Sequence, residues 1–251
     1  MKTKARLDQI LFERGLVESR TKAQALIMAG KVFAGGKRLD KPGTQIFIET
    51  ELQVVGPVHP WVSRGGLKLC HALSFFGVNP KNYVCIDIGA STGGFSDVLL
   101  ANGAAKIYAI DVGRGQLAWK LQSNDRVIVM DKTNARYLTK ADIPDPIDLI
   151  VCDTSFISLK TVLPSPLKLT KIGSHLIALI KPQFEVGRAR VGKGGIVREP
   201  FLHEEVCQGV RIWLDKIIGW KVHDISESPI RGADGNKEFF IWAQFLPDRY
   251  L

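Results

Sequence analysis

From residue 83 onward, short apolar segments alternate with segments of helical periodicity. Strands that are apolar along their whole length are buried on both faces, as in a parallel sheet covered by helices. The alternation therefore predicts an α/β fold with a doubly wound, Rossmann-like sheet. The apolar segments span 83–88, 106–112, 127–130, 147–152 and 175–180, and helices are expected at about 93–102, 115–122 and 158–169.

The pattern changes at the C-terminal end of the chain. A helix is expected at about 201–216, followed by two strands at 221–226 and 238–245. A loop without a long helix joins these two strands, whereas parallel neighbours need a long crossover that is usually a helix. The last strand is therefore expected to run antiparallel.

The first 58 residues show a separate pattern of two short helices and small strands. Helices are expected around residues 7–11 and 19–29, and short strands at 31–34 and 45–49, which together make a small α+β module. Two prolines close together then interrupt regular structure before a helix at 63–77. The predicted domains are residues 1–58, a linker at 59–62, and residues 63–251.

Basic residues outnumber acidic ones by 34 to 25, which gives a formal net charge of +9 and a pI near 9.4. Residues 1–60 contain ten of the basic and six of the acidic side chains, so nearly half of the surplus lies in the N-terminal module. A surplus of this size favours a polyanionic partner, nucleic acid first, although modest basicity also occurs in proteins without such a partner.

Several classes of protein do not fit the composition. With 45% apolar and 24% charged residues, the chain has the composition of a globular protein. No run approaches the roughly 18 apolar residues that span a bilayer, and the N-terminus lacks the apolar core of a signal peptide. The four cysteines lie far apart in the sequence, so we expect a cytoplasmic protein with neither disulfides nor a structural metal.

A glycine-rich segment follows the first strand of the alternating region and opens a helix. A dinucleotide fingerprint would need glycine where the chain has Ser91, so NAD is not favoured. Asp87 suits a cationic group, Asp111 suits ribose hydroxyls, and Asp131 suits an adenine amino group. Strand-end Asp residues also form simple turns, but three in succession favour S-adenosylmethionine. The candidate cofactor-binding residues are Asp87, Gly89, Ala90, Ser91, Thr92, Gly93, Gly94, Phe95, Asp111, Val112, Asp131 and Asp153.

Several strings of residues resemble one known family. Residues 1–58, with the corner Ala29-Gly30-Lys31-Val32, look like an S4-type RNA-binding domain. Residues 63–69 (SRGGLKL), 152–156 (CDTSF) and 179–185 (LIKPQFE) look like the FtsJ-type, RrmJ-like methyltransferases. The combination is similar, over essentially the whole chain, to the TlyA family, also called haemolysin A. The resemblance implies a Rossmann-like class I methyltransferase sheet with an antiparallel last strand, joined to a small α+β S4-type domain.

The resemblance also implies a reaction, the transfer of a methyl group from S-adenosylmethionine to a ribose 2′-hydroxyl of ribosomal RNA. The family's Lys-Asp-Lys-Glu pattern matches Lys68, Asp153, Lys181 and Glu238. A lysine accepts the hydroxyl proton only after its ammonium has lost one, and a second lysine nearby favours that loss by like-charge repulsion. We expect Lys181 to be the base, with Lys68 and Asp153 orienting it and Glu238 as an outer support.

Basic residues mark the expected RNA contacts, which would position the RNA without reading its sequence. Residues 187–195 carry three basic residues among four glycines and are expected to form a mobile loop that becomes ordered on RNA phosphates, a solvated loop being the alternative. Trp61 could stack on a base or pack between domains, and packing is favoured. The candidate RNA-binding residues are Arg6, Arg20, Lys22, Lys31, Lys37, Arg38, Arg64, Arg188, Arg190 and Lys193.

Two other functions remain open. A membrane-active haemolysin would need an apolar span or a strongly amphipathic basic helix, and the sequence shows neither. A non-catalytic RNA-binding or ribosome-assembly factor would keep the basic module without the chemistry, and the intact set of lysines and acids argues against it. Ribosomal RNA or ribosomal subunits are the expected partners, without stable insertion into a membrane.

Overall fold

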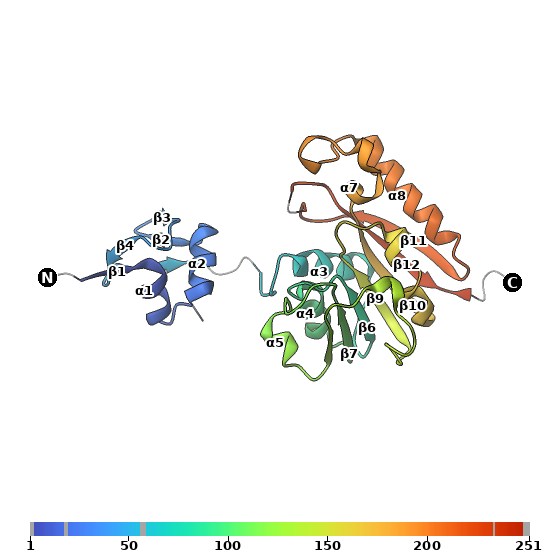
Figure 1. The fold of residues 1–251 in the computed structure, drawn as a ribbon, viewed down its shortest axis with the longest axis horizontal. Helices are drawn as coiled ribbons and strands as arrows, with labels where there is room; N and C mark the ends of the chain where they lie inside the picture. The colour runs from blue at the N-terminus through green and yellow to red at the C-terminus, as the bar shows by residue number, and fades with distance from the viewer. Residues whose placement is uncertain (1–2, 18–19, 56–58, 233, 248–251) are drawn as a thin grey trace. The chain divides into compact units, whose positions relative to one another are not determined.

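Residues 3–17, 20–55, 59–232 and 234–247 of the 251-residue chain are described by the computed structural model (Figure 1). The side chain of Lys22, one of the predicted RNA contacts, lies outside the described part. The chain divides into two compact units, residues 1–60 and residues 61–251, and each unit has its own fold.

The N-terminal unit packs two helices against two small antiparallel sheets. Strand β1 pairs with β4, and the order in the other sheet is β3-β2-β5. Leu7, Leu11 and Ile27 are fully buried in its core, which confirms the two helices expected from their spacing. The elements are β1 (Lys4–Arg6), α1 (Leu7–Glu13), α2 (Arg20–Met28), β2 (Val32–Ala34), β3 (Lys37–Leu39), β4 (Gln45–Phe47) and β5 (Gln53–Val54).

The C-terminal unit is built on one seven-stranded sheet with the order β11-β12-β10-β9-β6-β7-β8. Strands β10, β9, β6, β7 and β8 are parallel, and β12 runs antiparallel to both of its neighbours. The strands are β6 (Val84–Ile88), β7 (Lys106–Ile110), β8 (Val127–Met130), β9 (Ile147–Cys152), β10 (Thr170–Ile180), β11 (Trp220–Glu227) and β12 (Phe239–Phe245). The predicted Rossmann-like sheet with an antiparallel last strand is therefore confirmed.

Helices and turns of the C-terminal unit cover both faces of this sheet. The α-helices are α3 (Gly65–Phe76), α4 (Gly94–Ala101), α5 (Trp119–Gln122), α6 (Leu159–Val162), α7 (Pro182–Glu185) and α8 (Pro200–Asp215). Short 3-10 helices lie at Ala135–Tyr137, Pro166–Leu169, Arg188–Arg190 and Lys193–Gly195.

Two hydrophobic cores lie on opposite faces of the sheet. Helices α3 and α4 contribute Leu69 and Val98 to one core, and α8 contributes Val210 to the other. Because neighbouring residues of a strand point to opposite faces, β9 supplies Val151 to the first core and Ile150 to the second. This double burial is what the uniformly apolar strands of the sequence predicted.

Two predicted helices are shorter than expected. The helix expected at 115–122 is present only as α5, since Gly115 has φ +62° and the preceding residues form a loop. The helix expected at 158–169 is divided into α6 and a 3-10 turn. Pro164 and Pro166 explain the break, because proline lacks the amide proton that an α-helix needs in its interior.

Candidate active site

Four charged side chains from distant parts of the sequence meet at the carboxyl edge of the parallel strands. Asp153 directly follows β9, and Lys181 directly follows β10. Glu238 directly precedes β12, which is antiparallel to β10, so its start lies at the same edge. Lys68 reaches this edge from α3. The structure thus brings together all four residues of the predicted catalytic set.

Their charges alternate along a continuous chain of contacts. Lys181 Nζ lies 2.6 Å from Asp153 Oδ1, and Lys68 Nζ lies 3.9 Å from Asp153 Oδ2. Lys68 Nζ also donates a hydrogen bond of 2.5 Å to Glu238 Oε2. One carboxylate therefore bridges two ammonium groups, and the second carboxylate holds the outer lysine.

Burial makes these contacts necessary. Lys68, Lys181 and Glu238 are only 7%, 8% and 3% exposed. A charge removed from water needs a partner of opposite sign, and here two cations and two anions balance. Lys181 Nζ has a further partner, the Ser155 hydroxyl, to which it donates a 3.0 Å hydrogen bond. The cluster is a fixed arrangement of amines and acids at the sheet edge.

The cluster opens into a cavity of about 310 Å³. Lys68, Asp153 and Lys181 line this cavity together with the glycine-rich loop, whereas Glu238 lies behind Lys68 and does not line it. A second cavity of about 790 Å³ adjoins the first and shares Gly89, Ser91, Asp153 and Ser155 with it. A two-part ligand can therefore extend from the larger cavity to the two lysines.

Glycine is needed at the start of the loop between these cavities. Gly89 has φ +81°, and a Cβ atom there would lie 2.6 Å from the carbonyl oxygen of Asp153. Gly93, with φ +95°, is the N-cap residue of helix α4, and a Cβ atom there would lie 2.1 Å from a methyl carbon of Leu121. The loop thus passes close to both neighbouring elements, and only glycine permits that approach.

Asp87 is fully buried two residues before Gly89. Ser96 donates to Asp87 Oδ2 from both its backbone amide (2.9 Å) and its hydroxyl (2.7 Å). Asp87 Oδ1 has no hydrogen-bond partner among the described residues. Burial raises the pKa of Asp87 to about 7. Asp87 therefore keeps one unpaired carboxylate oxygen buried beside the loop, behind the lining of the two cavities.

Asp111 and Asp131 hold the next loop. Asp111 lines the larger cavity, and its carboxylate accepts hydrogen bonds from the backbone amides of Ser91 (2.8 Å) and Gly113 (2.7 Å). Asp131 accepts from the Gly115 amide at 2.8 Å. Of the predicted cofactor residues, those that line a cavity are Gly89, Ala90, Ser91, Thr92, Gly94, Phe95, Asp111, Val112 and Asp153, and those that line neither are Asp87, Gly93 and Asp131.

Several residues of the site were not predicted. Phe156, 91% exposed with φ +65°, and Arg136 line the larger cavity. Glu185 ties two loops together, because its carboxylate accepts from the Ser158 hydroxyl and the Leu159 amide, both at 2.7 Å. Burial raises the pKa of Glu185. Phe156 and Glu185 lie in or beside strings that the resemblance rests on, but a string does not show which member points inward.

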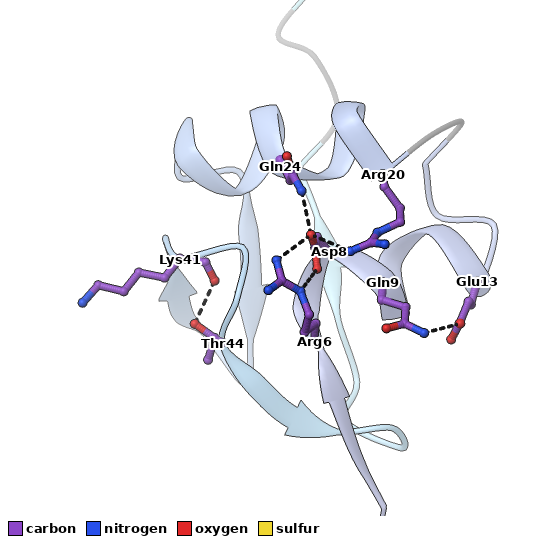
Figure 2. Close-up of polar contacts among 8 residues, drawn as sticks. All are labelled: Arg6, Asp8, Gln9, Glu13, Arg20, Gln24, Lys41 and Thr44. Carbon is purple, nitrogen blue, oxygen red and sulfur yellow. Dashed lines mark hydrogen bonds and ion pairs between the residues drawn. The ribbon is translucent and has the colours of Figure 1, made fainter.

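Two predicted RNA contacts of the N-terminal unit are held by a buried acid (Figure 2). Arg6 Nε lies 3.0 Å from Asp8 Oδ1, and Arg20 Nη2 lies 3.3 Å from Asp8 Oδ2. Gln24 donates to the same carboxylate at 2.8 Å. The Arg6 guanidinium holds the pKa of Asp8 well below its usual range. Both arginines remain about half exposed, so their outer faces are open to a ligand.

The remaining predicted RNA contacts differ in their surroundings. Residues 187–195 form two 3-10 turns, and Arg190 pairs with Glu205 at 2.6 Å. Arg64 begins helix α3 and lines the smaller cavity. Trp61 packs on the core of its own C-terminal unit, where Gly66 leaves space for its ring, and the predicted packing between domains stays a prediction. The others, Lys31, Lys37, Arg38, Arg188 and Lys193, are half-buried or exposed.

Comparison with known proteins identifies the family. The family model described as FtsJ-like methyltransferase matches residues 61–245, and the S4 domain model matches residues 5–47. The "16S/23S rRNA (cytidine-2'-O)-methyltransferase TlyA" of Mycobacterium tuberculosis is 44% identical to this chain, over 100% of it and 94% of the relative. The chain belongs to the TlyA family of FtsJ-like methyltransferases. Membership confirms the predicted class of enzyme and its cofactor, S-adenosylmethionine.

Other relatives of this TlyA-family chain carry two kinds of name. A Bacillus subtilis (strain 168) protein named "Putative rRNA methyltransferase YqxC" is 50% identical, over 95% of this chain and 85% of the relative. A solved structure titled "Putative hemolysin from Streptococcus thermophilus" is 43% identical with a TM-score of 0.75, covering 98% of this chain and 90% of that one.

The described part of the TlyA-family chain contains neither a candidate membrane span nor a candidate metal-ligand cluster. None of its helices there is both long and apolar enough to cross a bilayer. The same residues contain no group of three or more His, Cys, Asp or Glu side chains placed to hold a metal ion.

Proposed function

We propose that this chain methylates a ribose 2′-hydroxyl of ribosomal RNA. The observation that carries the proposal is the convergence of Lys68, Asp153, Lys181 and Glu238 beside the cavity of the glycine-rich loop. Relatives named as 16S and 23S rRNA cytidine-2'-O-methyltransferases support the choice of substrate. A site with two amines and two acids at the reacting end suits deprotonation of a hydroxyl better than attack by a base carbon.

S-adenosylmethionine would be held by the loop and the strand ends around it. Gly89 and Ser91 border both cavities, Asp111 lines the larger one, and Asp87 offers a buried carboxylate for a cationic group. Asp131 would act indirectly, by fixing the loop that contains Gly115. When bound, the cofactor supplies an electrophilic methyl group.

Lys181 is the proposed base. A ribose hydroxyl is a poor nucleophile at neutral pH, so its proton must leave at or near the moment of transfer. Lys181 Nζ lines the smaller cavity and is oriented by Asp153 (2.6 Å) and Ser155 (3.0 Å). Lys68 lies on the other oxygen of the same carboxylate, 3.9 Å from Asp153 Oδ2, so Asp153 fixes the positions of both amines at the cavity.

The other residues of the cluster position these groups. Glu238 holds Lys68 from behind at 2.5 Å and keeps its ammonium at the cavity. Asp153 sets the direction of both lysines. Holding the hydroxyl, its base and the methyl group in line is expected to supply much of the rate acceleration.

The N-terminal domain is proposed to position the RNA. The proposed domains are the N-terminal domain at residues 1–58, a linker at 59–62 and the catalytic domain at 63–251. In the N-terminal domain, the outer faces of Arg6 and Arg20 are exposed. Phosphate contacts of this kind fix the register of a nucleic acid and leave sequence selection to other contacts. The protein is proposed to act on ribosomal RNA or ribosomal subunits in the cytoplasm.

The base assignment is tested by Lys181→Ala, with Lys171→Ala as the matched control. Each lysine pairs with an aspartate, but Lys181 directly follows β10, whereas Lys171 lies near its start, contacts Asp148 and is half exposed. Purified ribosomal subunits are incubated with labelled S-adenosylmethionine, and cofactor affinity is measured by calorimetry. Lys181→Ala is expected to lower methyl transfer at least about a hundredfold with cofactor affinity nearly unchanged. Retained transfer would reject Lys181 as the base.

Two alternative functions can be tested with the same purified protein. An RNA-binding assembly factor would bind ribosomal subunits tightly without transferring any label. The haemolysin names of some relatives suggest membrane damage, and this is tested by leakage of liposomes exposed to pure protein. We expect label transfer and no leakage.

A further inference from the structure

A separate hollow, distinct from the two cavities of the candidate active site, lies at the same edge of the sheet. Its volume is about 290 Å³, and it is lined by Arg198, which precedes α8, and by Arg231 and Lys237 from the segment between β11 and β12. That segment joins the carboxyl end of β11 to the start of β12, at the edge where β9 and β10 end. Lys237, which lines the hollow, directly precedes Glu238 of the candidate active site in the sequence.

The lining of this hollow is positively charged. Its described lining contains Arg198, Arg231 and Lys237 and no carboxylate, and the acids on the same segments, Glu199 and Asp234, are not part of it. Arg231 donates a hydrogen bond to the backbone oxygen of Gly235 (3.0 Å). This bond uses one of the five N–H groups of the guanidinium. The cations therefore retain donors for an anion.

Lys237 has one competing partner. Its Nζ lies 2.9 Å from Glu227 Oε2, with the two side chains 37% and 51% exposed. Exposed ion pairs contribute little to stability. A phosphate group can therefore bind Lys237 beside Glu227 or in its place.

The walls of the hollow are fixed by buried hydrogen bonds within the protein. Asn236, 1% exposed, accepts from the Val197 amide and donates to the Gly195 oxygen, both at 2.9 Å. The Nε2 atom of buried His203 lies 2.9 Å from the Val197 oxygen. These bonds join the segment before α8 to the segment before β12. A site built in advance loses less entropy when it binds a ligand.

We propose that this hollow binds backbone phosphates of the RNA strand that flanks the target nucleotide. The inference rests on the proposed function, because it takes ribosomal RNA as the polyanion. Arginine and lysine donate charge-assisted hydrogen bonds to phosphate oxygens, and each contact releases counterions from the RNA. A groove of about 510 Å³ along α8 shares Pro200, His203 and Lys237 with the hollow. Arg211 adds a cation to its lining and Glu204 and Glu227 add two acids, so the hollow itself is the anion site.

The test compares two full-length triple variants that lose the same charge. Arg198→Gln, Arg231→Gln and Lys237→Gln together alter the hollow. Lys81→Gln, Lys168→Gln and Lys216→Gln together are the control, since these exposed lysines precede β6, β10 and β11 at the opposite edge of the sheet. Affinity for purified ribosomal subunits is measured over a series of salt concentrations.

The hollow variant is expected to bind at least about tenfold more weakly, with a salt slope reduced by about 0.7 to 0.9 for each lost phosphate contact. The control variant is expected to match the wild type. An unchanged slope in the hollow variant, or an equal loss in both variants, would overturn the proposal. Arg198→Gln and Arg231→Gln are also measured singly, so that misfolding of the triple variant does not decide the result.

Methyl transfer by the wild type is followed in the same samples. If the wild type transfers no label, the proposed function fails, while the binding comparison still reports on the hollow. If transfer occurs and the hollow variant binds like the control, only the phosphate site fails.

Discussion

At the scale of single residues, pairing explains how charged groups persist inside the candidate active site. Asp153 is shared by Lys68 and Lys181, and Glu238 supports Lys68, so each buried charge has an opposite neighbour. Asp87 differs, because its partners are the neutral amide and hydroxyl of Ser96. Its position therefore costs stability unless a cation binds nearby.

The raised pKa of Asp87, about 7, makes a prediction for stability against pH. Between about pH 4 and about pH 7 the Asp87 carboxyl of the folded protein binds more protons than that of the unfolded chain. The contribution of Asp87 to stability is therefore largest below about pH 4 and is lost as the pH rises through about 7. The full effect is at most about 4 kcal/mol. Asp87→Asn has no such charge and is expected to lose this part of the pH dependence. Urea unfolding at pH 5 and pH 8 measures the change in the free energy of unfolding for the wild type and for Asp87→Asn. The same change in both proteins would contradict the account.

Glu185 is expected to act as a positioning residue. It fixes the loop after β9 to the segment after Lys181 by bonds to Ser158 and Leu159, so Glu185→Ala leaves two donors without a partner. We expect kcat to fall about tenfold or more, cofactor affinity to change little, and Glu185→Gln to restore part of the rate. Asp125→Ala, which removes an exposed acid before β8, serves as the control. A parallel fall of kcat and cofactor affinity would indicate general damage instead.

Prediction from sequence was complete for some residues and partial for others. The four positions of the proposed catalytic set came from the family's Lys-Asp-Lys-Glu pattern, and the structure places their side chains together. The partners Ser155 and Glu185 lie inside the same region but were missed, because adjacent residues of a loop point in different directions and spacing alone does not tell them apart. Buried hydrogen bonds become visible only in three dimensions.

At the scale of elements, apolar alternation predicted the strands of the C-terminal sheet, because burial on both faces dominates their composition. Helix lengths were less predictable, since Pro164 and Pro166 divide the segment after β9 and Gly115 shortens α5. Strands β1, β3 and β5 were missed, because each contains a single apolar residue and so shows no apolar run or alternation.

The glycine-rich loop gives a prediction at this scale. Gly89→Ala is expected to abolish cofactor binding, because its Cβ atom would lie 2.6 Å from the Asp153 oxygen and the loop would have to move. Gly115→Ala is the matched control, since Gly115 also has positive φ (+62°) but nothing within 4 Å of the added atom. The control is expected to lose only about 1 kcal/mol of stability and to keep binding. Equal affinities measured by calorimetry for the two variants would contradict the steric explanation.

At the scale of the whole molecule, the chain joins two folded units, and the acid Asp8 is central to the first. Fully buried, it holds Arg6 and Arg20 together, and its lowered pKa means that its contribution is present above the ordinary pKa of an aspartate and is lost as the pH falls. Asp8→Ala is expected to destabilise the N-terminal unit by about 1–3 kcal/mol and to leave the unfolding of the C-terminal unit unchanged. Calorimetry measures the unfolding transition of each unit. A shift of both transitions in Asp8→Ala would contradict the expectation that the two units unfold independently.

The net charge of +9 pointed to a polyanion, but composition does not say where the cations gather. The structure shows basic side chains along the edge of the C-terminal sheet, at the cavity that Arg64 lines and at the hollow of Arg198, Arg231 and Lys237. RNA recognition by this family member is therefore expected to involve both units.

Mapping of the transferred methyl group tests the central claim most directly. Ribosomal subunits are labelled by the wild type, the RNA is digested to nucleosides, and the position of the label is determined by mass spectrometry. The cluster of Lys68, Asp153, Lys181 and Glu238 predicts a methyl group on the 2′-oxygen of a ribose, absent when Lys181→Ala is used. A methyl group on a base, or equal labelling by the variant, would contradict the account.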